Sequence, residues 1–506
     1  MGTVAKIISV APVGFDGHII EVESDMTKGL PGLTIVGLGN KAIDEAKERV
    51  KSAIGNSLLE YPPKRITVNL APAELPKDGT HYDLPIALAI LTSSGQLRAT
   101  HTDGAVFAGE LALDGKLRAI SGAVTVAETA KQHGFSTVYI PEGSVEQASL
   151  VEGIQIVGVK DLKSLYLHLK KEALITPVQA NSPHAEQTTP KEGPFLDDVF
   201  GQEQAKRAIA IAAAGHHNIL LAGPPGAGKT MLAKTLVSLL PPLDSAERLA
   251  VTKIHSLAGV LTEQAVTLRP FRSPHHTSSQ ISLIGGGARP RPGEVSLAHH
   301  GVLFLDEIPE YPRSVLEALR QPLEDKTVSV SRANGRAVYP ADFMLVATMN
   351  PCPCGYYGDT AHECTCSSMQ IINYQKKLSG PLLDRIDMVI SVTRVPNKQL
   401  LHTNTSTKTQ HISVGNSINN AMTAQRHRYR SSNKNNGSLS SSDVKKYIAL
   451  SPQAQLLLTT AADKLSLSPR SYFKVIKVAR TIADLDGDES VDARHLSEAL
   501  QYRQSA

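Results

Sequence analysis

The stretch from Asn218 to Leu236 constrains the fold of this chain more than any other. It begins with an apolar run, Ile219–Ala222, that has the composition of a buried strand. A glycine-rich turn with the spacing G-x-x-x-x-G-K-T follows, and then residues 231–236, whose apolar spacing suits a helix. In such an arrangement, successive backbone amides point inward around an anion at the positive end of the helix. The pattern predicts a phosphate site built on a strand, a turn and a helix.

Two residues of this turn have individual roles in the predicted site. Lys229 would reach the β- and γ-phosphates of ATP, and the hydroxyl of Thr230 would coordinate Mg²⁺. Glycine-rich turns also occur simply as tight turns, but the strand, the lysine and the threonine in register favour phosphate. We expect the nucleotide to be bound by Gly223, Pro224, Pro225, Gly226, Ala227, Gly228, Lys229 and Thr230.

A second run of strand-like composition, Gly301–Leu305, ends in two adjacent carboxylates. Parallel sheets present the carboxyl ends of their strands to ligands. We therefore expect Asp306 to bind the nucleotide's Mg²⁺ and Glu307 to orient or polarise the attacking water. The alternative is a charged pair that merely begins a loop, and the phosphate-binding turn makes that interpretation less favourable.

Three more polar residues complete a candidate catalytic set. Asn350 ends another buried strand, where it could sense the γ-phosphate and position water. Arg385 lies in the sequence D-R-I-D and is a candidate arginine finger that reaches a neighbouring subunit, although arginine in such a sequence also forms ordinary salt bridges. Arg470 begins a helix near the carboxyl end and is a candidate second sensor of the γ-phosphate.

Composition limits the range of functions. The 506 residues carry a formal net charge of +4, which permits nucleic acid as a partner without requiring it. Aromatic residues make up only 4% of the chain, and this argues against a base-stacking platform. No apolar run approaches the roughly 20 residues of a membrane span, and the amino terminus lacks a signal-peptide pattern. We expect a soluble, cytoplasmic protein with no membrane partner.

Basic residues are concentrated between the two phosphate-site motifs. Residues 269–300 contain four arginines, four histidines and one glutamate, with many glycines and prolines. These loops could contact a polyanion threaded through a ring, or they could be a solvated surface whose histidines are satisfied locally. Residues 328–340 read as a hairpin with Asn334-Gly335 at the turn, flanked by Arg332 and Arg336.

All four cysteines lie close together in the sequence, as Cys352-Pro353-Cys354 and Cys364-Thr365-Cys366. Four clustered thiols in a reducing compartment fit a structural Zn²⁺ site of the Cys₄ type. One intervening residue within each pair is tighter than the usual two to four, so reduced thiols that only stabilise a loop remain the alternative.

Shifts in composition predict five regions. A mixed α/β unit covers residues 1–175, and a polar linker rich in proline, serine and threonine covers 176–194. A nucleotide-binding core follows at 195–400, then a polar basic connector at 401–442 and a helical unit at 443–506.

The first unit resembles the proteolytic domain of Lon-type proteases, a two-layer α/β fold, in its P-K-D-G segment at 76–79 and in the hairpin near 109–117. In that family a serine nucleophile and a lysine base follow these segments. Here His81 and Val124 occupy the corresponding positions, so peptide hydrolysis has neither nucleophile nor base. We expect an assembly or binding module.

The order of motifs resembles the magnesium-chelatase-like branch of AAA+ ATPases, and with the Lon-like unit nearly the whole chain is similar to the bacterial YifB/ComM group. The resemblance implies an α/β AAA+ core with a parallel sheet, helices on both faces and a small helical lid. It also implies a homo-hexameric ring, assembled with ATP or DNA, that binds single-stranded or branched DNA through pore loops. Its helicase activity would promote branch migration during natural transformation and homologous recombination. A chelatase-type motor subunit and an ATP-driven protein remodeller are the alternatives.

Overall fold

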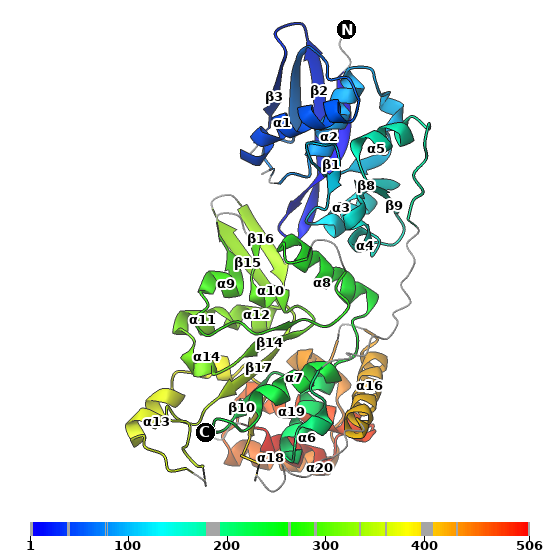
Figure 1. The fold of residues 1–506 in the computed structure, drawn as a ribbon. Helices are drawn as coiled ribbons and strands as arrows, with labels where there is room; N and C mark the ends of the chain where they lie inside the picture. Colours follow the sequence, from blue (N-terminus) through cyan, green and yellow to red (C-terminus); the bar gives the residue numbers. More distant parts are fainter. Residues whose placement is uncertain are drawn as a thin grey trace.

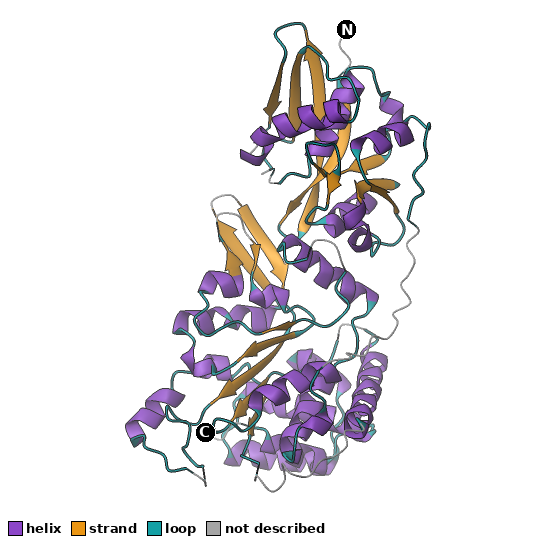
Figure 2. Ribbon diagram, in the orientation of Figure 1, coloured by secondary structure: helices purple, strands orange, loops and turns teal. Residues whose placement is uncertain are grey.

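The computed structural model describes residues 4–37, 41–75, 77, 79–178, 193–261, 265–287, 291–332, 335–359, 362–395, 408–431 and 434–503. Figure 1 shows an elongated molecule, with the amino-terminal unit at one end and the nucleotide-binding core with the carboxyl-terminal helices at the other. Figure 2 shows strands covered by helices in both parts.

The amino-terminal unit contains a four-stranded sheet and a three-stranded parallel sheet. The first has the order β1 (Ala5–Val13), β2 (Asp16–Thr27), β4 (Arg65–Ala71) and β3 (Gly32–Val36). The second has the order β5 (Ala105–Phe107), β8 (Thr137–Pro141) and β9 (Gln155–Val159). The short hairpin of β6 (Glu110–Leu111) and β7 (Leu117–Arg118) follows β5. The helices are α1 (Lys41–Asn56), α2 (Asp83–Ser93), α3 (Ala123–Gln132), α4 (Val145–Ala148) and α5 (Leu162–Leu169).

His81 and Val124, the two residues that we aligned with the Lon-type dyad, are both buried. The imidazole of His81 lies 3.1 Å from the carbonyl of Val10, and burial lowers the pKa of His81 to about 4. Val124 is fully buried on α3 among apolar side chains. His81 thus has a local hydrogen bond and an environment that keeps its ring neutral.

A five-stranded parallel sheet forms the centre of the second unit. Its order is β11 (Phe271–Arg272), β14 (Val302–Leu305), β17 (Met344–Met349), β10 (Ile219–Ala222) and β18 (Met388–Ser391). Successive residues of a strand face opposite sides of a sheet. Ile219 and Leu221 accordingly join a core with α6 (Glu203–Gly215) and α7 (Lys229–Leu239), whereas Leu220 joins a separate core on the other face. Burial on both faces explains why these strands read as continuous apolar runs.

Several short elements surround this sheet. The hairpin of β15 (Thr327–Arg332) and β16 (Gly335–Pro340) forms as expected, but Asn334 at its tip and the side chains of Arg332 and Arg336 lie outside the described part. The other elements are α8 (Ser245–Leu257), α9 (Gln280–Ile284), β12 (Gly285–Gly286), β13 (Arg291–Pro292), α10 (Glu294–Leu297), α11 (Arg313–Ala318), α12 (Arg320–Asp325), α13 (Ser368–Gln375) and α14 (Gly380–Leu383).

The carboxyl-terminal helical unit begins earlier than the sequence suggests. A 21-residue helix, α16 (Thr409–Tyr429), occupies half of the region 401–442 that we expected to be a polar connector. Only a narrow stripe of it is buried, namely Ile418, Ala421, Gln425 and Tyr429, which explains its polar appearance. It packs on α6 and on α19 (Pro469–Asp486). The remaining helices are α17 (Ser441–Tyr447), α18 (Pro452–Lys464) and α20 (Ala493–Gln501).

Helix α8 joins the two units. Lys253 forms an ion pair with Glu128 of α3, and its ammonium lies 4.1 Å from the centre of the Phe15 ring. The hydroxyl of Ser256 accepts a hydrogen bond of 2.8 Å from the backbone amide of Gly122. Near the other end of the helix, Glu247 pairs with Arg269 of the core.

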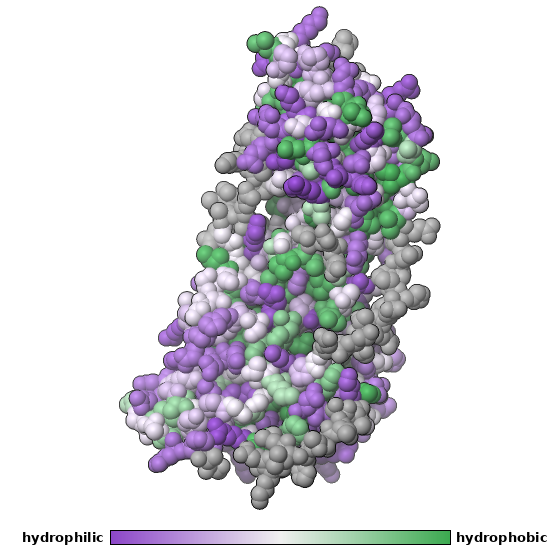
Figure 3. Space-filling model, in the orientation of Figure 1, coloured by the Kyte–Doolittle hydropathy of each residue, from purple (hydrophilic) through white to green (hydrophobic). Residues whose placement is uncertain are grey.

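Hydrophilic residues dominate the upper and lower parts of the face shown in Figure 3, and apolar residues gather in patches near the middle. Among the described helices, none is long and apolar enough to cross a membrane.

Candidate nucleotide site

The glycine-rich turn connects β10 to α7 in the predicted way. Gly226 and Gly228 have φ angles of +75° and +82°, a conformation that glycine adopts without the strain of a side chain. A Cβ atom at Gly223 would lie 2.1 Å from the carbonyl oxygen of Val392 on the segment after β18. The turn therefore needs glycine both for its backbone conformation and for its close packing.

Lys229 links the turn to the end of β17. Its ammonium donates hydrogen bonds to the carbonyls of Gly223 and Pro224, and to Oδ1 of Asn350 at 2.9 Å. Burial lowers the pKa of Lys229, and the nearby carboxylates of Asp306 and Glu307 oppose that shift. The structure thus brings together the lysine, the asparagine and the acidic pair, which lie in segments that follow three separate strands of the sheet.

Thr348 positions both carboxylates, and our sequence reasoning missed it. Its hydroxyl donates a hydrogen bond of 2.5 Å to Oδ1 of Asp306 and accepts one of 2.9 Å from the backbone amide of Glu307. The available signal was a lone hydroxyl in the apolar run of β17, since Thr348 is fully buried. Glu307 itself has φ +49° and ψ +52°, a left-handed conformation that is uncommon for a residue with a side chain. Such strain is frequent in functional sites.

Glu307 and Asn350 face a cavity of about 670 Å³, and the amide of Asn350 donates a hydrogen bond of 3.3 Å to Oε1 of Glu307. Other residues of its lining include His276, Glu310, Tyr374 and Lys377. A carboxylate that is both oriented by an amide and exposed to a polar cavity can accept a proton from water.

A second cavity, of about 740 Å³, lies between the segment before α6 and the start of α16. Gln202 connects this region to the glycine-rich turn, because its amide donates to the carbonyl of Ala227 at 2.6 Å and to that of Thr393 at 3.1 Å. The lining includes Val199, Phe200, Gly201, Lys206, Gln410 and Val414.

The two candidate arginines lie together at another place. Arg385 forms an ion pair with Glu324 of α12 and donates to the carbonyl of Arg320 at 3.0 Å. The guanidinium of Arg470 lies 3.9 Å from the same Glu324. Arg385 and Arg470 thus both lie against Glu324 of α12, whereas Lys229 contacts the turn and Asn350.

Part of the basic segment has internal partners. Arg269 pairs with Glu247 at 2.8 Å, and Arg272 pairs with Glu294 at 2.6 Å. These two arginines therefore support the fold and do not form a free basic surface. Arg289 lies outside the described residues, and Arg291 is exposed. Of the histidines, His299 is buried and accepts a hydrogen bond from the amide of Asp342, as the solvated-surface alternative anticipates.

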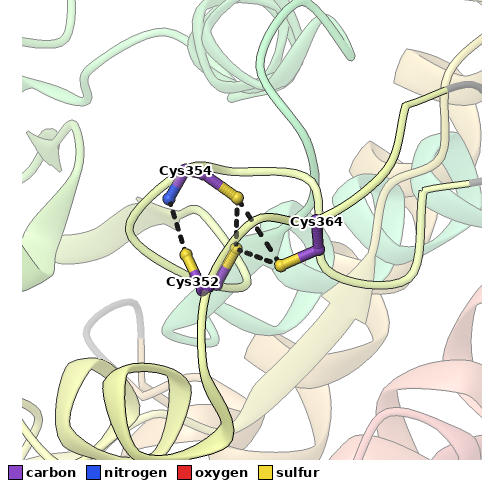
Figure 4. Close-up of side chains that lie close together, drawn as sticks. Cys352, Cys354 and Cys364 are labelled. Atoms are coloured by element: carbon purple, nitrogen blue, oxygen red, sulfur yellow. Dashed lines mark hydrogen bonds between the residues drawn. The ribbon is translucent and has the colours of Figure 1, made fainter.

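The four cysteine thiols converge within one loop. Their Sγ atoms all lie within 4.8 Å of one another, although the pairs are separated by nine residues in the sequence. Figure 4 shows Cys352, Cys354 and Cys364 pointing toward a common centre. Cys366 completes the group, and its sulfur lies 3.4 Å from the backbone amide of Cys354.

The groups on the glycine-rich turn and at the end of β14 suit the binding of ATP together with Mg²⁺. The turn offers backbone amides at the amino end of α7, and Lys229 supplies a cation beside them. Thr230 in the first turn of α7 and Asp306 at the end of β14 provide the oxygen ligands that Mg²⁺ prefers.

Comparisons with known proteins show the family to which this chain belongs. Residues 195–400 match the family described as magnesium chelatase, subunit ChlI. Residues 22–144 match a second family, described as subunit ChlI of Mg-chelatase. Residues 408–503 match a third family, described as magnesium chelatase, subunit ChlI C-terminal. The competence protein ComM of Haemophilus influenzae is 42% identical over 503 residues, covering 99% of this chain and 97% of that protein. The chain belongs to the YifB/ComM family of magnesium-chelatase-like AAA+ ATPases.

Two other relatives of this YifB/ComM-family chain show different extents of similarity. YifB of Escherichia coli is 42% identical over 500 residues, covering 97% of this chain and 96% of that protein. The magnesium-chelatase 67 kDa subunit of Heliobacterium mobile is 26% identical over 215 residues, 36% of this chain and 32% of that protein. The comparisons confirm the predicted family, and the parallel sheet with helices on both faces confirms the predicted AAA+ fold class.

Proposed function

We propose that this YifB/ComM-family ATPase is a DNA motor that assembles as a homo-hexamer and promotes branch migration during natural transformation and homologous recombination. One observation carries the motor part of the proposal: the acidic pair, Asn350 and Lys229 form one hydrogen-bonded group, while Arg385 pairs with Glu324 elsewhere. A site divided in this way is completed when the arginine of one protomer reaches the phosphates bound by the next. The similarity to a competence protein supports the DNA part.

Each residue of the divided site has a specific task. The amides of the turn and Lys229 would bind the phosphates, and the cavity beside Gln202 would accommodate the base and ribose. When bound by Thr230 and Asp306, Mg²⁺ would neutralise part of the negative charge on the phosphates. Glu307 accepts a proton from water at its carboxylate, and Asn350 orients that carboxylate. Arg385 and Arg470 would stabilise charge from the neighbouring protomer.

DNA contacts would come from a smaller basic surface than the sequence indicates. Arg269 and Arg272 are neutralised within the protomer. The exposed Arg291 near β13, the hairpin of β15 and β16, and the last turn of α16 with its Arg426 and Arg428 remain as sources of positive charge. Arg428 also pairs with Asp484, so Arg291 and Arg426 are the better candidates for phosphate contacts.

A strand-displacement assay on forked and three-stranded DNA tests the proposal. We expect ATP-dependent unwinding that Lys229→Ala and Glu307→Gln abolish, whereas the control Glu152→Gln, at an exposed residue of the amino-terminal unit, retains it. DNA binding should weaken as salt is added, because phosphate contacts release counterions. ATP hydrolysis without strand displacement on either substrate would refute the DNA motor and favour a protein remodeller or a chelatase-type subunit.

A further inference from the structure

We propose that Cys352, Cys354, Cys364 and Cys366 bind one Zn²⁺ ion, and that this metal holds their loop against the phosphate-binding turn so that zinc loading strengthens ATP binding. The inference rests on the proposed function only in assuming that the turn binds ATP. It adds a metal site and a structural coupling to that turn.

The distances between the sulfurs match a tetrahedral zinc site. The Sγ atoms of Cys352 and Cys354 are 3.3 Å apart, those of Cys354 and Cys364 are 3.6 Å apart, and those of Cys352 and Cys364 are 3.7 Å apart (Figure 4). Zn–S bonds of about 2.3 Å in a tetrahedron place sulfurs about 3.8 Å apart. A disulfide would need sulfurs at about 2.05 Å. Three of the sulfurs are thus spaced close to those of a tetrahedral site, and the sulfur of Cys366 lies within 4.8 Å of each of them.

Backbone amides support these sulfurs as thiolates. The amide of Tyr357 donates to Sγ of Cys352 at 3.3 Å, and the amide of Cys354 donates to Sγ of Cys366 at 3.4 Å. Hydrogen bonds to the sulfur atoms of a metal site hold those sulfurs in the orientation that the metal needs. Binding converts four thiols and one Zn²⁺ into four Zn–S bonds, and the protons of the thiols are released to solvent.

The loop contacts the phosphate-binding turn directly. A Cβ atom at Gly355 would lie 2.7 Å from both Cδ and Cγ of Pro225, so the backbone of the loop packs on this proline ring. Cys352 also follows Asn350 by two residues, and Pro353 lines the cavity that contains Glu307. A metal that fixes this loop therefore fixes one wall of the nucleotide site.

Arg394 forms a second bridge between the loop and the turn. Its guanidinium donates to the carbonyl of Pro225 at 3.2 Å and contacts Nδ1 of His362 at 3.0 Å. It also lies 3.7 Å from Asp359 and 5.7 Å from the centre of the Tyr356 ring. Arg394 thus connects the turn to three side chains located between the two cysteine pairs.

Metal analysis of the purified full chain tests the site. We expect about one zinc per chain in the wild type, a loss of zinc in the double variant Cys354→Ser/Cys364→Ser, and retention in the control Thr365→Ser, which changes an exposed residue between two ligands. A wild-type chain that contains no zinc and takes up none when Zn²⁺ is added would overturn the metal site.

Binding of a fluorescent ATP analogue tests the coupling. We expect roughly tenfold weaker binding by the double cysteine variant and by chelated wild type, with recovery when Zn²⁺ is returned. Arg394→Ala should keep zinc and still weaken binding, which separates the coupling from a folding defect. Zinc-free protein that binds the analogue as tightly as the zinc-loaded chain would overturn the coupling.

Lys229→Ala distinguishes failure of the inference from failure of the proposed function. This variant should retain zinc and lose the analogue. Normal analogue binding by Lys229→Ala would refute the assumed phosphate site, whereas the zinc content would still report on the cysteines. Failure of DNA unwinding alone would leave both the zinc site and its coupling intact.

Discussion

The hydroxyl of Thr348 donates a hydrogen bond of 2.5 Å to the carboxylate of Asp306. The two residues come from adjacent parallel strands, because Leu305 at the end of β14 pairs with Ala347 of β17. The same hydroxyl also accepts the amide of Glu307. One buried threonine thus sets the position of the candidate metal ligand and of the candidate general base.

Replacement of this threonine by valine should separate binding from hydrolysis. Thr348→Val keeps the shape but removes the hydrogen bonds to the exposed carboxylate of Asp306 and to the amide of Glu307, each worth roughly 0.5–3 kcal/mol. We expect the ATP hydrolysis rate to fall by about 10- to 100-fold, measured by phosphate release, with a smaller change in nucleotide affinity. Thr235→Val is the matched control, since Thr235 is equally buried and its hydroxyl bonds only within α7. Unchanged hydrolysis by Thr348→Val would show that the hydroxyl positions neither carboxylate.

Arg385 should act between protomers. Because the Glu324 side chain is half exposed, its ion pair with Arg385 contributes only about 1 kcal/mol toward holding the arginine within its own protomer. The arginine also donates to the carbonyls of Arg320 and Pro381, and these hydrogen bonds would have to be exchanged for contacts to the neighbour's phosphates. We expect Arg385→Ala to reduce ATP hydrolysis by about 10³-fold or more. A mixture of Arg385→Ala with Lys229→Ala should recover part of the activity, because some interfaces then combine an intact turn with an intact arginine. If the mixture is as inactive as its components, Arg385 does not serve a neighbour's site.

Gly355→Ala should disturb the contact between the cysteine loop and Pro225. The added methyl group would meet the proline ring at 2.7 Å in a backbone conformation with φ +86°. Gly358→Ala is an unusually close control, since its φ is +79° but an added Cβ would meet nothing within 4 Å. Titration with the fluorescent ATP analogue should show weaker binding for Gly355→Ala than for Gly358→Ala. Equal affinities would mean that packing on Pro225 contributes nothing to the nucleotide site.

His81 should make the amino-terminal unit sensitive to acid. Its pKa is lowered to about 4 in the fold, whereas an exposed histidine has a pKa near 6.5. As the pH falls, the imidazole of His81 is therefore protonated in the unfolded chain before it is protonated in the folded one. Above about pH 6.5 the ring is neutral in both states and the stability is complete. Between pH 6.5 and pH 4 the free energy of unfolding decreases by roughly 3 kcal/mol. His81→Gln should show a smaller decrease of melting temperature between pH 6.5 and 4.5 than the wild type, by about 5–10 °C.

The exposed His18 provides the comparison for that measurement. His18→Gln removes an exposed histidine of the same unit and should leave the melting temperature at pH 6.5 unchanged. Identical pH dependence for His81→Gln and the wild type would show that His81 does not remain neutral in the fold.

How far the sequence predicts this molecule depends on how local each feature is. The phosphate-binding turn and the Asn334-Gly335 hairpin are written in contiguous residues, so they could be recognised directly. The role of Thr348 depends on the pairing of β14 with β17, which the sequence does not display. The neutralisation of Arg269 depends on Glu247, 22 residues earlier and outside the basic segment. Helix α16 could not be predicted from the sequence, because its buried stripe is too narrow to produce a clear apolar period.

Helix α8 is held at both ends, by Arg269 near its start and by Glu128 and Gly122 near its finish. A rotation of the ATPase core that moves Arg269 would therefore also move α8 and, through its contacts, the amino-terminal unit. In the ring that we propose, the amino-terminal unit would move together with the ATPase core during ATP hydrolysis.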